Sequence, residues 1–375
     1  HTLLEGVSPV AAVGLGVQVD INKVPAGIVS VMTGSDLAAK DAALADPAIT
    51  KALLKADAVI GVRARFDASG AMTSAGLTCA LCHVTVTPTT FTLSAGATAL
   101  PIGQPRYDGV PNAVIDSGKI LSLTPFVAGL GDGGATAAVL AGWGPGNFDI
   151  RALPDNPLED GVVNPTNNPP IWNFVDLEQQ GYLFGWDGLF KNNGSSNNAL
   201  ASQAEAVYDL VMHGNGAFGT IAGSLAPELS VTPPQALLDA LAAAETAQPG
   251  NDITKAKLLD LQAWMRSITS PAPVAFDEAK AELGFELFNG KAACSTCHKT
   301  ADFTGPGTVT AVTHPGGGLA GGIKIPRLRG VAHTAPYLSN GSVPTLAGAV
   351  DGVLQVLGVT VTDADGASVG HSFGI

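Results

Sequence analysis

The chain has 375 residues, enough for two domains and a sizeable buried core, and its hydrophobic content of 46% excludes a disordered tail. Thirty-two acidic residues outnumber nineteen basic ones, so the net charge of −13 disfavours nucleic acid as a partner and leaves a basic protein partner open. No apolar run reaches the roughly 18 to 20 residues of a membrane span. The chain starts at His1, so we expect either that a leader was removed or that the N-terminus is not represented.

The 46 glycines and 25 prolines predict many ordered turns and few long helices. Along the chain, residues 142–185 are crowded with Pro, Asn and Gly and are expected to form ordered loop. The stretch ITKAKLLDLQAWMRSI, residues 253–268, predicts a helix that the prolines of the linker SPAPVAFDE, residues 270–278, bring to an end. The following stretch predicts an amphipathic helix ending at Gly290.

All four cysteines fall into two copies of one pattern, C-x-x-C-H. This pattern is typical of c-type haem attachment, in which each Cys forms a thioether with a vinyl group and the His supplies a ring nitrogen to iron. Cysteines three residues apart lie on one face of a helical turn, and the next residue reaches the iron. The sequence therefore predicts two covalent haem c groups, bound by Cys79, Cys82, His83, Cys294, Cys297 and His298.

Two other readings of the cysteines are open. A thioredoxin-like dithiol needs a βαβ context and has no use for the histidine after the second Cys. A shared zinc site would take four thiolates and leave both histidines without a role. Because bacterial haem c is assembled outside the cytoplasm, the haem interpretation predicts a periplasmic or extracellular protein. The expected fold is mainly α and loop-rich, with two cytochrome c-like haem domains: residues 1–269, carrying long loop insertions, and residues 270–375.

The chain resembles the bacterial di-haem cytochrome c peroxidase and MauG superfamily, and within it most closely the branch that contains the rubber oxygenase RoxA. The matching stretches extend from about residue 76 to the end, whereas the first 60 or so residues carry little that matches. They are GLTCALCHVTV, RYDGVPNAVIDSGKI, GWGPGNFDI, NPTNNPPIWN, FGWDGLF, VMHGNGAFG, NGKAACSTCH, IPRLRGVAHTAPYLSNGSVPTL and GHSFG.

The resemblance implies roles for three residues near the first haem. A Trp-Asp-Gly segment places Trp186 between the haems, where an aromatic ring shortens an electron path; the alternative is an ordinary core Trp. Gln203 matches a family Gln, and His213 takes the place of a distal-pocket Glu that handles protons. An imidazole with a pKa of about 6.5 suits proton transfer near neutral pH. His213 has two other readings, a sixth iron ligand and a solvent-facing histidine.

The resemblance also implies further ligands. Residues 84–103 contain no His or Met, so the first iron has either an open sixth position or His213. For the C-terminal haem the sixth ligand is His371, and two imidazoles would leave that iron closed and suited to electron transfer. Asn167 matches a family Asn that binds calcium, the alternative being an Asn that caps a turn. Leu189 and Ser339 replace an Arg and a His common in these stretches, and substrate identity does not carry over.

The leading hypothesis is a di-haem oxidoreductase that reacts with peroxide or dioxygen at the N-terminal haem. The C-terminal haem would exchange electrons with it and with a small redox protein, a cytochrome or a cupredoxin. The competing hypotheses are an electron-transfer cytochrome without catalysis, with both irons six-coordinate, and a subunit of a larger redox complex. The sixth position of the first iron distinguishes the enzyme from the electron-transfer cytochrome, because only the enzyme needs that position open.

Overall fold

The computed structural model describes residues 2–129, 131–149, 165–175, 186, 258–299, 301–306, 308–309 and 323–350. The chain divides into two compact units, residues 1–148 and residues 149–375. The division expected at the Pro-rich linker, after residue 269, falls inside the second unit. The two expected haem domains, residues 1–269 and 270–375, stay a prediction. None of the described helices has the length and apolar composition that crossing a bilayer requires.

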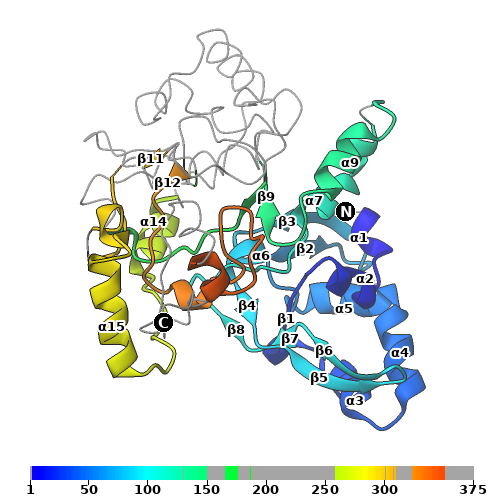
Figure 1. The fold of residues 1–375 in the computed structure, drawn as a ribbon. Helices are drawn as coiled ribbons and strands as arrows, with labels where there is room; N and C mark the ends of the chain where they lie inside the picture. Colours follow the sequence, from blue (N-terminus) through cyan, green and yellow to red (C-terminus); the bar gives the residue numbers. More distant parts are fainter. Residues whose placement is uncertain are drawn as a thin grey trace. The chain divides into compact units, whose positions relative to one another are not determined.

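The first unit combines short helices with short paired strands (Figure 1). Its helices are α1 (Thr2–Glu5), α2 (Pro9–Gly14), the 3-10 helix η1 (Ile21–Lys23), α3 (Ala26–Thr33), α4 (Leu37–Ala45), α5 (Pro47–Lys55), α6 (Ala80–His83), α7 (Ser117–Ser122), α8 (Pro125–Ala128) and α9 (Ala135–Ala141). Its strands are β1 (Val19–Asp20), β2 (Val62–Phe66), β3 (Met72–Leu77), β4 (Thr85–Val86), β5 (Thr89–Leu93), β6 (Gly96–Leu100), β7 (Ile102–Gly103), β8 (Pro105–Arg106) and β9 (Asn147–Phe148).

Local sequence signals set several of these boundaries. Side chains of Ser8, Asp36, Asp46 and Asp116 accept hydrogen bonds from backbone N–H groups in the first turns of α2, α4, α5 and α7. Strands β2 and β3 form an antiparallel hairpin, as do β5 and β6; β4 pairs antiparallel with β8, and β1 pairs parallel with β7.

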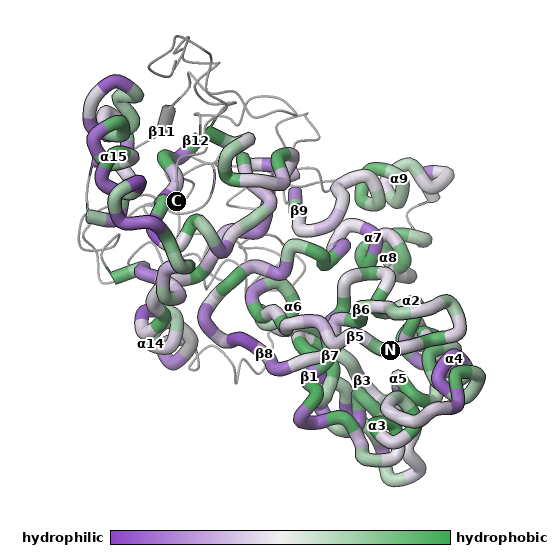
Figure 2. The backbone as a smooth tube through the Cα atoms, turned by 60° about the horizontal axis from the view of Figure 1, so that its bottom comes forward, coloured by the Kyte–Doolittle hydropathy of each residue, from purple (hydrophilic) through white to green (hydrophobic). Residues whose placement is uncertain are grey.

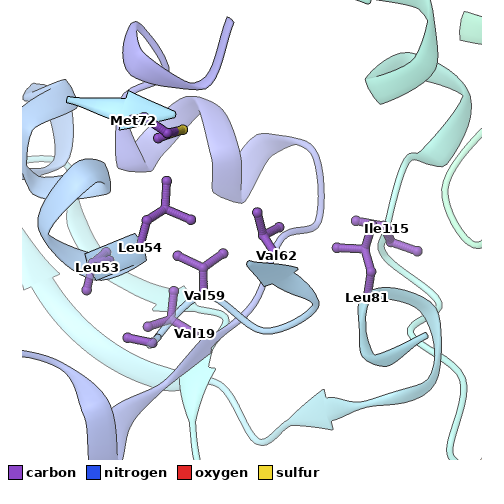
Figure 3. Packing of buried hydrophobic residues seen from close by; sticks show 9 residues of the cluster. Val19, Leu53, Leu54, Val59, Val62, Met72, Leu81 and Ile115 are labelled. Atoms are coloured by element: carbon purple, nitrogen blue, oxygen red, sulfur yellow. The ribbon is translucent and has the colours of Figure 1, made fainter. Parts of the chain in front are cut away.

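One core cluster of the first unit lies between α5, β1, β2 and the turn of α6 (Figure 3). It consists of nine buried side chains, Val19, Leu53, Leu54, Ala58, Val59, Val62, Met72, Leu81 and Ile115. Leu81 belongs to the first C-x-x-C-H motif and lies beside Ile115 in this core. The motif is therefore built into the packed interior of its unit rather than carried on a free loop.

Within its described residues, the second unit has two longer helices and several short elements. They are β10 (Thr166–Asn167), α14 (Leu258–Ser267), α15 (Glu278–Asn289), the 3-10 helix η5 (Cys294–Thr296), β11 (Thr308–Val309), β12 (Ile323–Lys324) and the 3-10 helix η6 (Val331–His333). Strands β11 and β12 pair antiparallel. Apolar and polar residues are interspersed along α15, as Figure 2 shows. The expected helix before the second motif is confirmed, since Asp277 caps α15 and Gly290 follows its last residue.

Two stretches on which the resemblance rests lie together in the second unit. Trp172 is fully buried, and its Nε1 donates to the carbonyl oxygen of Arg329 over 3.1 Å. A guanidinium nitrogen of Arg327 donates to the carbonyl oxygen of Trp172. The stretch around Trp172 thus anchors the segment that follows β12, which carries both arginines.

Candidate functional site

One helical turn presents the three residues of the first motif. Cys79 is the N-cap residue of α6, and its carbonyl oxygen accepts from the backbone N–H groups of Cys82, over 3.2 Å, and of His83, over 3.1 Å. Cys79 is exposed and Cys82 half-buried, and neither forms a disulfide. Residues three apart on such a turn share a face, so both sulfurs can reach one bound group.

Packing fixes the position of this turn. Leu81 lies between the two cysteines in the sequence, points into the core and is 5% exposed. Gly61 crosses directly beneath it with φ +79°, and a Cβ atom there would lie 2.3 Å from the Cα atom of Leu81. Only glycine fits that close backbone approach without strain.

The buried residues Asn112 and Gln18 hold the same turn through hydrogen bonds. The backbone N–H of Asn112 donates to the carbonyl oxygen of Cys82 over 2.7 Å, and its side-chain Nδ2 donates to that of Leu81 over 3.0 Å. Gln18 donates from Nε2 to Oδ1 of Asn112, 2.8 Å away, while its own Oε1 accepts from the N–H of Val86. Two amide side chains thus hold the backbone on both sides of His83.

Burial keeps the side chains of the first motif neutral. It lowers the pKa of His83 to about 4, so the imidazole is uncharged near neutral pH, as a metal ligand must be. Burial, and then the neighbouring Cys79, raise the pKa of the Cys82 thiol to about 11. A reactive dithiol or a zinc site needs thiolates, which such an environment disfavours, whereas a thioether carries no charge. The environment therefore suits covalent haem attachment.

His83 keeps an unmet bonding capacity. Its Nδ1 is buried and has no hydrogen-bond partner among the described residues. Buried polar atoms without a partner are rare in folded proteins and call for a physical explanation, such as a group that the chain does not itself supply. At His298 the same ring atom donates to a carbonyl oxygen and Nε2 is left for a metal, so the unpartnered Nδ1 of His83 does not itself indicate an iron.

The second motif repeats the backbone geometry of the first. The carbonyl oxygen of Cys294 accepts from the N–H groups of Cys297, over 3.2 Å, and of His298, over 3.0 Å. The turn here is the 3-10 helix η5 rather than α6. Gly305 lies against it, since a Cβ atom at that position would be 2.6 Å from the carbonyl oxygen of Cys297.

His298 differs from His83 because its ring is hydrogen-bonded. Nδ1 lies 2.7 Å from the carbonyl oxygen of Phe303, which requires the proton on Nδ1 and leaves the Nε2 lone pair available to a metal. Phe288 packs near both rings, 6.3 Å from the centre of the imidazole and 5.6 Å from that of Phe303. Burial lowers the pKa of His298, which keeps it neutral.

The loop that orients His298 is itself tied down. The N–H of Lys299 donates to the carbonyl oxygen of Thr304 over 2.9 Å, and Oγ1 of Thr304 donates to that of Ile325 over 2.6 Å. The buried carboxylate of Asp302 lies 3.4 Å from the guanidinium of Arg329. The segment after β12 therefore sets the position of the carbonyl group that holds the imidazole.

The structure joins two further residues of interest. Trp186 donates from Nε1 to the carbonyl oxygen of Asn167 over 2.6 Å, and its own carbonyl oxygen accepts from the N–H of Lys324 over 2.8 Å. Asn167 is buried and donates from Nδ2 to the carbonyl oxygen of Pro336, while its Oδ1 has no partner among the described residues. The free oxygen is of the type calcium prefers, although the described residues hold no group of three or more His, Cys, Asp or Glu able to bind a metal.

Three predicted residues, Gln203, His213 and His371, lie outside the described residues, and their roles stay predictions. Conversely, the contacts of Asn112, Gln18 and Thr304 were not predicted. Asn112 lies in a stretch that matches the superfamily, but no local pattern there indicates a role.

Comparison with known proteins supports the haem interpretation. Residues 322–353 match the family model described as RoxA-like, cytochrome c-like. The match indicates a cytochrome c-like segment at these residues. It supports covalently bound haem c and an oxidoreductase of the cytochrome type. The matched residues include β12, Arg327, Arg329 and the loop at Pro336 and Tyr337.

Among the solved structures that match is "Crystal structure of a MauG-like protein associated with microbial copper homeostasis". The similarity has a TM-score of 0.29 and 16% identity, and covers 56% of this chain and 66% of that chain, slightly less than two thirds of its length. A TM-score this low carries no argument about the fold. A search of curated proteins finds no match.

Proposed function

We propose that the chain is a di-haem c-type cytochrome oxidoreductase that acts on peroxide or dioxygen at the haem bound by His83. The observation that carries the proposal is the repeated turn, in which the first Cys carbonyl accepts from the N–H groups of the second Cys and of the His in both motifs. The residues present fit the cofactor, since both histidines are neutral and the Cys82 thiol is protonated near neutral pH. Haem, when bound, supplies the iron redox chemistry.

The chain's own residues divide the remaining tasks. Cys79 and Cys82 hold one cofactor, and Cys294 and Cys297 hold the other. The buried surroundings of His83 exclude water from its iron-binding side chain. By the superfamily resemblance, His213 and Gln203 would handle protons and hydrogen bonds, and His371 would be a second ligand to the iron that His298 binds.

The same proposal extends to compartment and partner. Haem c attachment places the protein in the periplasm or outside the cell, and a small cytochrome or cupredoxin would deliver electrons through the C-terminal haem. Trp186, hydrogen-bonded to Asn167 and to β12, is an aromatic side chain suited to an electron path close to the His298 loop.

Mass spectrometry of the denatured protein tests the cofactor content. We expect two haem masses on the wild-type chain and one on each of the double variants Cys79→Ala/Cys82→Ala and Cys294→Ala/Cys297→Ala. A wild-type chain with no covalent addition, or with zinc in its place, would refute the proposal.

Ligand binding tests the reaction site. With an open N-terminal iron, carbon monoxide should bind one haem of two, and His213→Ala should slow peroxide consumption by roughly 10²- to 10⁴-fold, the scale for losing a general acid–base group. If His213 is the sixth ligand, the wild type should resist carbon monoxide and the variant should bind it. That second result would favour the electron-transfer cytochrome over the enzyme.

A further inference from the structure

Lys324 is a buried cation without a counter-charge. The residue lies on β12 and is 7% exposed. Its Nζ donates to the carbonyl oxygen of Ile325 over 2.9 Å and to Oγ1 of Thr304 over 3.3 Å. Neither acceptor carries a charge, and no carboxylate pairs with Nζ in the part of the chain that the structure describes.

Such an ammonium group is costly to bury. Lysine is almost never fully buried unless it is paired, and an isolated buried charge loses its hydration without recovering an equivalent attraction. The cost is visible here, since burial and then the positive charge of Arg327 lower the pKa of Lys324 to about 7. The two hydrogen bonds satisfy the donors only in part, so the site lacks one negative charge.

The missing charge belongs to the surroundings of the second motif. Thr304, which accepts from Lys324, directly follows Phe303, whose carbonyl oxygen holds the His298 ring. The positive charge of Lys324 is also close enough to His298 to contribute to lowering the pKa of the imidazole. An anion that neutralises Lys324 must therefore fit beside the iron-binding side chain.

Haem brings such an anion, because each haem carries two propionate carboxylates. We propose that Lys324 is the cationic partner of a propionate of the haem attached at Cys294 and Cys297. The inference rests on the proposed function only in requiring haem at that motif. It explains why a lysine occupies an interior position that offers only neutral acceptors.

The test compares Lys324→Met with the wild type in the haem-loaded protein. Infrared redox difference spectra, recorded with haem labelled with carbon-13 at the propionates, report the bonding of the carboxylates directly. We expect a propionate band to shift in the variant. The midpoint potential of the C-terminal haem should fall by the equivalent of about tenfold in the reduction equilibrium, about 59 mV for one electron, because a positive charge favours the reduced haem.

Two further variants complete the design. Lys291→Met removes an exposed lysine three residues before Cys294 and should change neither the band nor the potential. Lys324→Arg keeps the charge, so the potential should stay near the wild-type value while the propionate band moves. It also replaces Lys324→Met as the test variant if that protein does not fold.

The outcomes separate the two proposals. Unchanged propionate bands in every Lys324 variant that folds, with haem present on Cys294 and Cys297, would overturn the pairing and leave the di-haem function standing. Absence of haem from Cys294 and Cys297 in the denatured wild type would overturn both.

Discussion

Replacing Asn112 with Ala should loosen the first haem-attachment turn more than any exposed Asn replacement in the same unit. The side chain is 1% exposed and makes four hydrogen bonds. Nδ2 donates to the carbonyl oxygens of Gly16 and Leu81, and Oδ1 accepts from Nε2 of Gln18 and from the N–H of Val114.

The magnitude follows from the groups left behind. Each buried polar group that loses its partner costs about 1–3 kcal/mol. Taking the low end for four partially relaxing partners gives a loss of about 3–5 kcal/mol, a large fraction of the stability of an ordinary domain. Part of the loss should appear at Val86. Its N–H donates to Gln18, and Asn112 fixes the Gln18 side chain through a second hydrogen bond.

Hydrogen exchange followed by mass spectrometry, together with urea unfolding, measures both effects. Exchange of the Val86 amide should accelerate by roughly 10²-fold or more, since every 1.4 kcal/mol is about a factor of ten. Asn22→Ala is the matched control. The Asn22 side chain also makes three hydrogen bonds, with Asp20 and Gln104, but it is exposed, so water can replace the lost partners. A loss below about 1 kcal/mol for Asn112→Ala, or equal losses for both variants, would refute the reasoning.

Four shorter predictions follow from the same contacts. Gly61→Ala should destabilise the first unit and reduce haem loading at the first motif. Gly96→Ala, also at positive φ but with no atom within 4 Å of the added Cβ, should cost less stability and leave haem loading intact. Urea denaturation measures the stability, and mass spectrometry of the denatured protein measures the loading. Leu81→Ala should lower the free energy of unfolding by about 2–5 kcal/mol in urea titration, unless the core collapses around the cavity. His371→Ala should convert one low-spin signal to high-spin in electron paramagnetic resonance, and an unchanged spectrum would exclude that ligand. Asn167→Ala should lose a calcium ion that metal analysis finds in the dialysed wild type; a wild type without calcium contradicts that assignment.

Local patterns predicted the features that depend on neighbouring residues. The helix α15 was expected with its end at Gly290, because an amphipathic pattern followed by a glycine is a local signal; the Asp277 cap was found only in the structure. The attachment turns were expected for the same reason, since five consecutive residues carry the whole C-x-x-C-H chemistry. The expected helix at residues 253–268 is found in part, as α14.

Contacts between distant residues escaped prediction. The hairpins β2–β3 and β5–β6 were not anticipated; β2 alternates apolar residues with arginines, but its partner β3 and the strand β6 consist largely of Gly, Ala, Ser and Thr and carry little alternation. Asn112 joins Gln18 and Gly16, which lie 94 and 96 residues earlier, and no short motif announces such a clamp. Lys324 was not singled out from the sequence, because its burial and its uncharged acceptors depend on how β12 packs.

The two attachment turns also differ in the contacts on which they depend. The second begins with a close neighbour, since His298 bonds to Phe303 only five residues on, but the loop that carries Phe303 is held by Ile325 and Arg329 in the segment after β12. The first waits for Asn112, 31 residues after Leu81, and for Gln18, which reaches Val86 across 68 positions. Local contacts close quickly, and distant ones must first bring separated chain segments together. During synthesis, both turns therefore wait for later chain: the first for Asn112, and the second for the segment after β12 that holds its loop.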